Sequence, residues 1–115
     1  MLFPDSPETQ LGMNEQAQDN FQTQDLALEH LIRVIKEEAE KDIHKQMQFD
    51  EKLFDKCMNQ WNSYRQLHAE YVSNRYAGGS MQPLIYLSDM EKITKEKIES
   101  LSAEFEFLLR KINFS

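Results

Sequence analysis

The sequence has one cysteine in 115 residues and no long apolar run. A single cysteine, Cys57, cannot form an internal disulfide, which is typical of a protein from a reducing compartment. No segment approaches the roughly 18 consecutive apolar residues that a membrane-spanning helix requires. The first residues lack the basic and apolar segments of a secretory signal. We therefore expect an intracellular protein, cytoplasmic or nuclear, without a membrane partner.

The sequence also lacks a cluster of basic residues. The formal net charge is −7, and residues 1–25 carry five acidic side chains without any Lys or Arg. Nucleic-acid binding relies on a clustered basic surface, which the sequence does not contain. This charge distribution excludes nucleic acid as an expected partner.

The three glycines and three prolines all lie outside two windows, residues 13–77 and 84–115. In a helix interior Gly costs about 1 kcal/mol and Pro about 3 kcal/mol, so long windows without them favour helices. The pattern predicts an all-α fold: a long helix over about 25–77, a turn at 78–83 and a shorter antiparallel helix over about 88–113. This arrangement is a helical hairpin, or coiled coil, that occupies residues 23–115.

Residues 1–22 are rich in Gln, Asn and acidic side chains. Their large apolar residues, Leu11, Met13 and Phe21, follow no helical period. Such a segment buries too little apolar surface to offset its ordering entropy, so a disordered acidic tail is expected. Ser6, which precedes a proline, is a candidate phosphorylation site within it.

Two apolar stripes lie along the predicted long helix. The first lies in its N-terminal part and is predicted to contact a partner chain; its residues are Leu28, Leu31, Ile32, Ile35, Ile43 and Met47. The second has heptad spacing and is predicted to pack against the second helix as the core of the hairpin. That core comprises Phe54, Trp61, Tyr64, Leu67, Tyr71, Leu101, Phe105, Leu108 and Ile112. Cys57 is expected as a small core residue between Phe54 and Trp61.

The second helix has two possible starts. Ser88 and Glu91 match a capping box, in which serine and glutamate satisfy free backbone amides reciprocally. Alternatively, residues 83–87 form an additional helical turn with Pro83 in the first position.

The unequal lengths of the two helices indicate a partner. The second helix can fold back along residues 52–77 only, which leaves the first stripe exposed. An exposed apolar stripe of that length is larger than a monomer normally tolerates. The alternative is a bend near residues 46–50, marked by Asp50, which would close a three-helix bundle.

The sequence contains no recognisable catalytic constellation. Glu40 and His44 share a helix face but lack the further ligands of a metal site, so they are expected to be a surface pair. Cys57 and His68 lie about 16 Å apart along one helix, too far for a nucleophile and its base.

We therefore expect a non-catalytic adaptor subunit of an intracellular assembly that needs no cofactor, metal or small molecule. It would bind itself or partner helices through coiled-coil contacts. The alternative is a self-contained three-helix module that recognises a short peptide motif.

Overall fold

The computed structural model describes residues 7–42 and 48–113, with the side chains of residues 10–42 and 48–110. The elements in chain order are α1 (Pro7–Glu40), α2 (Glu51–Ser73), the single 3₁₀ turn η1 (Asn74–Tyr76), α3 (Gln82–Glu104) and α4 (Glu106–Asn113). No strand occurs within these described ranges. The predicted all-α class is confirmed.

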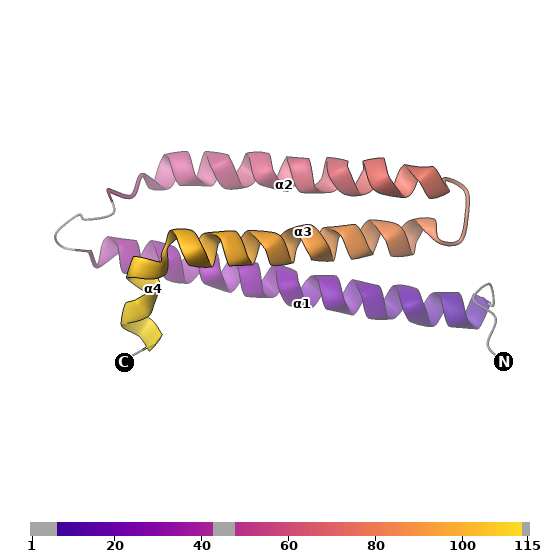
Figure 1. The fold of residues 1–115 in the computed structure, drawn as a ribbon, viewed down its shortest axis with the longest axis horizontal. Coiled ribbons are helices and arrows are strands. Elements are labelled where there is room, and N and C mark those ends of the chain that lie inside the picture. The colour runs from indigo at the N-terminus through magenta and orange to yellow at the C-terminus, as the bar shows by residue number, and fades with distance from the viewer. Residues whose placement is uncertain (1–6, 43–47, 114–115) are drawn as a thin grey trace.

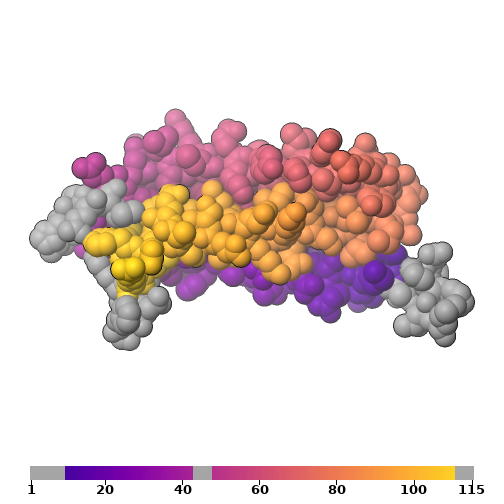
Figure 2. All heavy atoms as spheres, viewed as in Figure 1, coloured from indigo at the N-terminus to yellow at the C-terminus, as the bar shows by residue number. Residues whose placement is uncertain are grey.

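The three long helices lie side by side, with α3 between α1 and α2 (Figure 1). The chain runs along α1, returns along α2 and runs back along α3, so α2 is antiparallel to both α1 and α3. The space-filling view shows α3 along the middle of one face (Figure 2). The Cα positions extend over 60 × 29 × 16 Å, which describes a slim, flattened bundle. None of the described helices is long and apolar enough to cross a membrane.

The predicted continuous helix over 25–77 is wrong, because α1 ends at Glu40 and α2 begins at Glu51. Asp50 caps the N-terminus of α2: its Oδ1 atom accepts a hydrogen bond from the Leu53 backbone amide at 3.0 Å. Gln48 has a φ of 49°, in the left-handed region that interrupts a helix. The alternative, a three-helix bundle closed by a bend near residues 46–50, describes this chain reversal.

The expected tail over residues 1–22 is also corrected, because α1 begins at Pro7 and includes most of that segment. Gln10 and Ala17 are buried, as is Leu28 further along the same helix. Gln10, Ala17, Phe21, Leu28 and Ile35 follow steps of seven, four, seven and seven residues. The helical period was therefore present, but two of its positions hold small or polar side chains instead of large apolar ones.

The hydrophobic core lies at the end of the bundle where α4 folds over α1. Its buried members are Leu28, Ile35, Leu101, Phe105 and Leu108. The half-buried side chains that pack against them are Leu31, Ile32, Ala39, Phe49, Phe54, Met58, Trp61, Ile98 and Leu109. Phe49, Phe54 and Phe105 contact one another with ring centroids 5.2–5.9 Å apart.

The second predicted helix begins at the earlier of its two possible starts and is interrupted before its end. α3 begins at Gln82 with Pro83 in its first turn, as in the second of the two predicted starts. Ser88 and Glu91 therefore lie inside the helix and form no capping box, and Glu91 pairs instead with Lys95 at 2.9 Å. The helix is interrupted at Phe105, whose φ and ψ of −105° and 23° redirect α4.

Ile35 tests the closed bundle. Its side chain is fully buried, so Ile35→Ala should lower the free energy of unfolding by about 2–5 kcal/mol through lost burial and a residual cavity. Leu26→Ala, at an exposed position of the same helix, is the matched control and should change it by less than about 0.5 kcal/mol. Urea denaturation followed by circular dichroism measures both. Equal, small effects at the two positions would contradict the closed core.

Candidate protein-binding surfaces

A buried arginine joins the three long helices. Arg65 of α2 donates from Nη1 to Asp25 Oδ1 of α1 at 2.7 Å and to Thr94 Oγ1 of α3 at 2.9 Å. Its Nη2 donates to Asn62 Oδ1 at 2.6 Å. Thr94 is fully buried, and its hydroxyl donates a hydrogen bond to the carbonyl of Met90 at 2.6 Å. Each helix therefore supplies one polar group to the same guanidinium.

Two aromatic rings complete the surroundings of Arg65. Its guanidinium carbon lies 4.6 Å from the ring centroid of Trp61 and 5.4 Å from that of Phe21. A cation placed over a ring is attracted by the negative face of the π system, more strongly where water is excluded. The two terminal nitrogens of this buried charge are paired with polar groups of three helices, whereas its Nε atom is buried without a hydrogen-bond partner in the described structure. The contacts from three helices make the cluster a structural centre.

The residues of α2 that were predicted for the hairpin core lie on two different faces of that helix, one inward and one exposed. Phe54 and Trp61 are half-buried and Leu101, Phe105 and Leu108 are buried, whereas the side chain of Ile112 lies outside the described residues. Tyr64, Leu67 and Tyr71 are 55%, 66% and 65% exposed, so their expected core position is wrong. Cys57, expected as a small core residue, is also exposed. The inward positions between Trp61 and Ser73 belong instead to Arg65 and Ala69.

The core positions of α2 were wrongly predicted because the large apolar residues of this helix do not mark its inward face. The seam inferred from large apolar residues follows Tyr64 and Tyr71, whereas α3 packs on the face of α2 that carries a cation and an alanine. Leu53, Cys57, Tyr64, Leu67 and Tyr71 form an exposed line on α2, which we call the outer stripe.

His68 connects one edge of the outer stripe to α3. Its Nδ1 atom lies 2.7 Å from Asp89 Oδ2. The imidazole also lies 5.6 Å from the ring of Tyr64 and 6.2 Å from that of Tyr71, measured between centroids. The guanidinium carbon of Arg75 lies 5.7 Å from the Tyr71 centroid. The aromatic surface therefore continues to the end of α2.

The turn between α2 and α3, residues 74–81, lies at the end of the bundle where α1 begins (Figure 1). Its own backbone fixes its shape: Ala77 N donates to Asn74 O at 3.1 Å and Gly79 N to Tyr76 O at 2.9 Å. Gly78 has a φ of 79°, which a residue with a Cβ adopts only under strain. The turn exposes the side chains of Arg75 and Tyr76 in a defined conformation.

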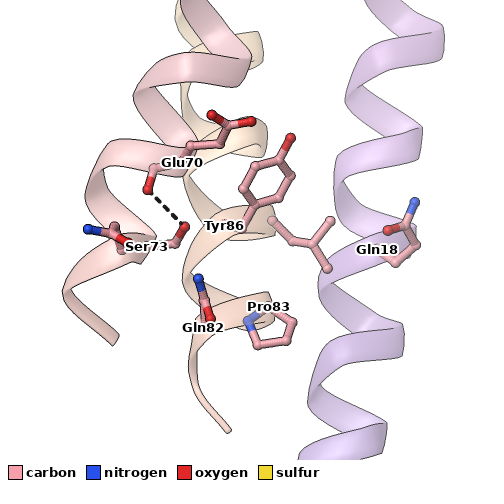
Figure 3. A pocket seen from close by; sticks show the side chains of 8 residues that line it. Gln18, Glu70, Ser73, Gln82, Pro83 and Tyr86 are labelled. Atoms are coloured by element: carbon pink, nitrogen blue, oxygen red, sulfur yellow. Dashed lines mark hydrogen bonds between the residues drawn. The ribbon is translucent and has the colours of Figure 1, made fainter. Parts of the chain in front are cut away.

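A pocket of about 660 Å³ lies beside this turn, bounded by all three long helices. Figure 3 shows Gln18 on α1, Glu70 and Ser73 on α2, and Pro83 and Tyr86 on α3 around the opening. The Ser73 hydroxyl donates to the Glu70 carbonyl at 3.3 Å, so this hydroxyl is directed to its own helix. The pocket is therefore a groove at the tip of the bundle with a carboxylate on its rim.

The predicted partner interface on the first stripe is corrected by burial. Leu28 and Ile35 are buried core residues, and the half-buried Leu31 and Ile32 pack against this core, so the stripe faces the interior of the bundle instead of a partner. Ile43, Met47 and Ser6, with His44 of the expected Glu40 pair, lie outside the described residues. No group of three His, Cys, Asp or Glu side chains in the described part of the chain could hold a metal ion.

The model of the protein family named "Lysozyme inhibitor LprI" matches residues 4–101, which is most of the chain. The chain belongs to the LprI family. No curated protein and no solved structure shows a significant match. The matched residues extend from α1 through most of α3. They therefore include Arg65 and both of its partner helices.

Membership of the LprI family corrects two expectations from the sequence. The predicted role as an intracellular adaptor subunit is wrong, because the family is one of protein inhibitors of lysozyme. The predicted intracellular location is wrong for the same reason, since lysozyme acts on cell walls outside the cytoplasm. A protein partner, the more general part of the prediction, agrees with an inhibitor family.

Substitution of Arg65 tests whether this cluster stabilises the bundle. Arg65→Ala should lower the free energy of unfolding by about 3 kcal/mol, because it removes the partner of Asp25 and the cation over two rings. Arg110→Ala is the matched control: its only observed ion pair, with Glu106, is exposed and should contribute about 0–1 kcal/mol. Thermal and urea denaturation measure both variants. A loss below about 1 kcal/mol for Arg65→Ala would contradict its central role.

Proposed function

We propose that this chain binds lysozyme directly and inhibits it, without catalytic activity of its own. The observation that carries the proposal is the family match, which spans 98 consecutive residues, from 4 to 101. Because the match extends over α1, α2 and most of α3, the inhibitor is the bundle itself and not a short segment attached to it. An inhibitor that works by binding needs a rigid contact element, and the bundle offers one at its tip.

The turn over residues 74–81 is that contact element. Retaining glycosidases such as lysozyme use two carboxyl groups about 5–5.5 Å apart. A guanidinium donates paired hydrogen bonds to a carboxylate, so an arginine placed in the catalytic cleft would occupy both acidic groups. Arg75 is exposed at the narrow end of the bundle, beside the exposed ring of Tyr76. Arginine and tyrosine are the side chains that most often dominate binding energy at protein interfaces.

The backbone of the turn favours this use. Its hydrogen bonds from Ala77 and Gly79 and the left-handed Gly78 fix the loop before any partner binds. A loop that is already ordered loses less conformational entropy on association, so more of the contact energy appears as affinity.

The charge of α1 supports an encounter with a basic enzyme. Its sequence contains eight acidic and two basic residues, a difference of −6 against −7 for the entire chain. A surface of one sign attracts a partner of the opposite sign and accelerates association, and salt screens this effect. Inhibition of a basic lysozyme should therefore weaken as the ionic strength rises.

An assay of cell-wall lysis by a c-type lysozyme tests the function and the contact element. The wild-type chain should slow the clearing of a cell-wall suspension in a saturable manner. Arg75→Glu should raise the inhibition constant at least tenfold, about 1.4 kcal/mol, because it places a carboxylate against the catalytic carboxyl groups.

Arg110→Glu is the control, since Arg110 is exposed on α4 at the opposite end of the bundle. It should inhibit like the wild type. A wild type that leaves lysis unchanged contradicts the function itself. Inhibition by Arg75→Glu at the wild-type level retains the function and excludes the turn as its contact.

A further inference from the structure

The outer stripe of α2 leaves an unusual amount of apolar surface in contact with water. The exposed large apolar side chains among the described residues number nine, and four of them, Leu53, Tyr64, Leu67 and Tyr71, lie on this one line. With Cys57 and Gln60 included, the steps along the stripe are four, three, four, three and four residues. Strict alternation of these steps is the pattern of a coiled-coil seam, and at 1.5 Å per residue it is about 27 Å long. The stripe therefore has the spacing that fits a second helix.

We propose that the outer stripe binds the outer stripe of a second copy of this chain, with the two α2 helices antiparallel. The order of steps reads identically in both directions, so an antiparallel copy of the stripe matches its spacing and each contact occurs twice, as in a two-fold interface. About an axis between Gln60 and Tyr64, Leu53 of one copy lies opposite Tyr71 of the other. In the same register Cys57 lies opposite Leu67, and Gln60 opposite Tyr64.

The charges beside the stripe agree with this occupant. In the heptad that the stripe defines, the flanking g positions hold Lys56, Ser63 and Glu70. Antiparallel helices bring the g positions of one chain against those of the other, so Lys56 meets the partner's Glu70, Ser63 meets its equivalent, and Glu70 meets the partner's Lys56. Neither Lys56 nor Glu70 forms an ion pair among the interactions observed in the described ranges. Both charges are therefore free to pair across the two-fold axis.

The opposite flank explains why only one further helix fits. Its e positions hold Phe54, Trp61 and His68, which already face the remainder of the same chain. A second α2 can approach only from the outside, over Tyr64 and Leu67. The interface involves neither the acidic face of α1 nor the backbone of the turn at 74–81. The two proposed surfaces meet only where the guanidinium of Arg75 lies over the ring of Tyr71.

Sedimentation of the complete chain over a range of concentrations tests the proposal. The wild type should form dimers, and Leu67→Glu should raise the dimer dissociation constant at least about 30-fold, because it places an unpaired charge in the seam. Leu67 is exposed in the single chain, so the variant should keep its helicity. Leu26→Glu, at an equally exposed leucine of α1, should leave the dissociation constant unchanged.

A charge exchange tests the antiparallel register. Lys56→Glu and Glu70→Lys should each weaken the dimer several-fold, and the double variant should restore it, since the two opposite charges then meet again. Cys57 supplies a second readout: its reaction with a thiol reagent should slow as the concentration rises and the seam closes.

Three results would overturn the proposal. The first is a wild type that remains monomeric up to roughly millimolar concentration. The second is a dimer that Leu67→Glu leaves intact or a double charge variant that stays weakened. The third is a monomeric wild type whose inhibition of lysozyme is lost in Leu67→Glu, which would assign the outer stripe to the enzyme.

Discussion

The ion pair between Arg65 and Asp25 is the interaction on which the arrangement of the helices depends. A guanidinium buried in a bundle must find acceptors, because an unpaired charge in that position is strongly destabilising. Arg65 finds them on all three long helices, in Asp25, Asn62 and Thr94. Apolar packing at the α4 end could tolerate small changes of register, whereas a forked donor with fixed geometry tolerates few. The cation thus sets how α1 and α2 lie on the two sides of α3.

This position has consequences at the surface. Because α3 packs against the Trp61, Arg65 and Ala69 face of α2, the opposite face with Tyr64 and Leu67 remains exposed. The same alignment brings α2 and α3 together at the turn, which holds Arg75 and Tyr76 at the end of the bundle. The proposed inhibitory turn and the proposed dimer seam are therefore both results of one buried charge. In an antiparallel dimer the two turns would lie at opposite ends, so each copy could still engage an enzyme.

The sequence predicted the helical class, the turn near residue 80 and the antiparallel return of the chain over Trp61 and Leu101, because Gly and Pro placement and apolar periodicity determine these features directly. It failed where the inward positions are not large and apolar. Ala17 and Gln10 hide the period of α1, and Arg65 and Ala69 hide the inward face of α2. An arginine four residues after the only tryptophan was the available signal for the buried cluster, since the two side chains share a helix face. Nothing local identified Asp25 as the partner, because that contact joins residues 40 positions apart.

The break between α1 and α2 shows the same limitation. Asp50 marks a possible bend in the sequence, yet residues 41–50 contain no Gly or Pro, and propensity alone favours a continuous helix. The cap of Asp50 on Leu53 and the closure of the core decide against it. Tertiary packing thus outweighed the local helix propensity, as is common for helices whose stability comes mainly from an apolar face.

Native-state hydrogen exchange tests most directly whether Arg65 unites the three helices. The backbone amides around Asp25 in α1, Arg65 in α2 and Thr94 in α3 should exchange with one common free energy of opening, equal to that of global unfolding. This result is expected because the guanidinium cannot leave one helix without losing its partners on the others. Exchange of the α1 amides at a distinctly lower free energy, while α2 and α3 stay protected, would contradict the account and describe an α2–α3 hairpin to which α1 is only loosely attached.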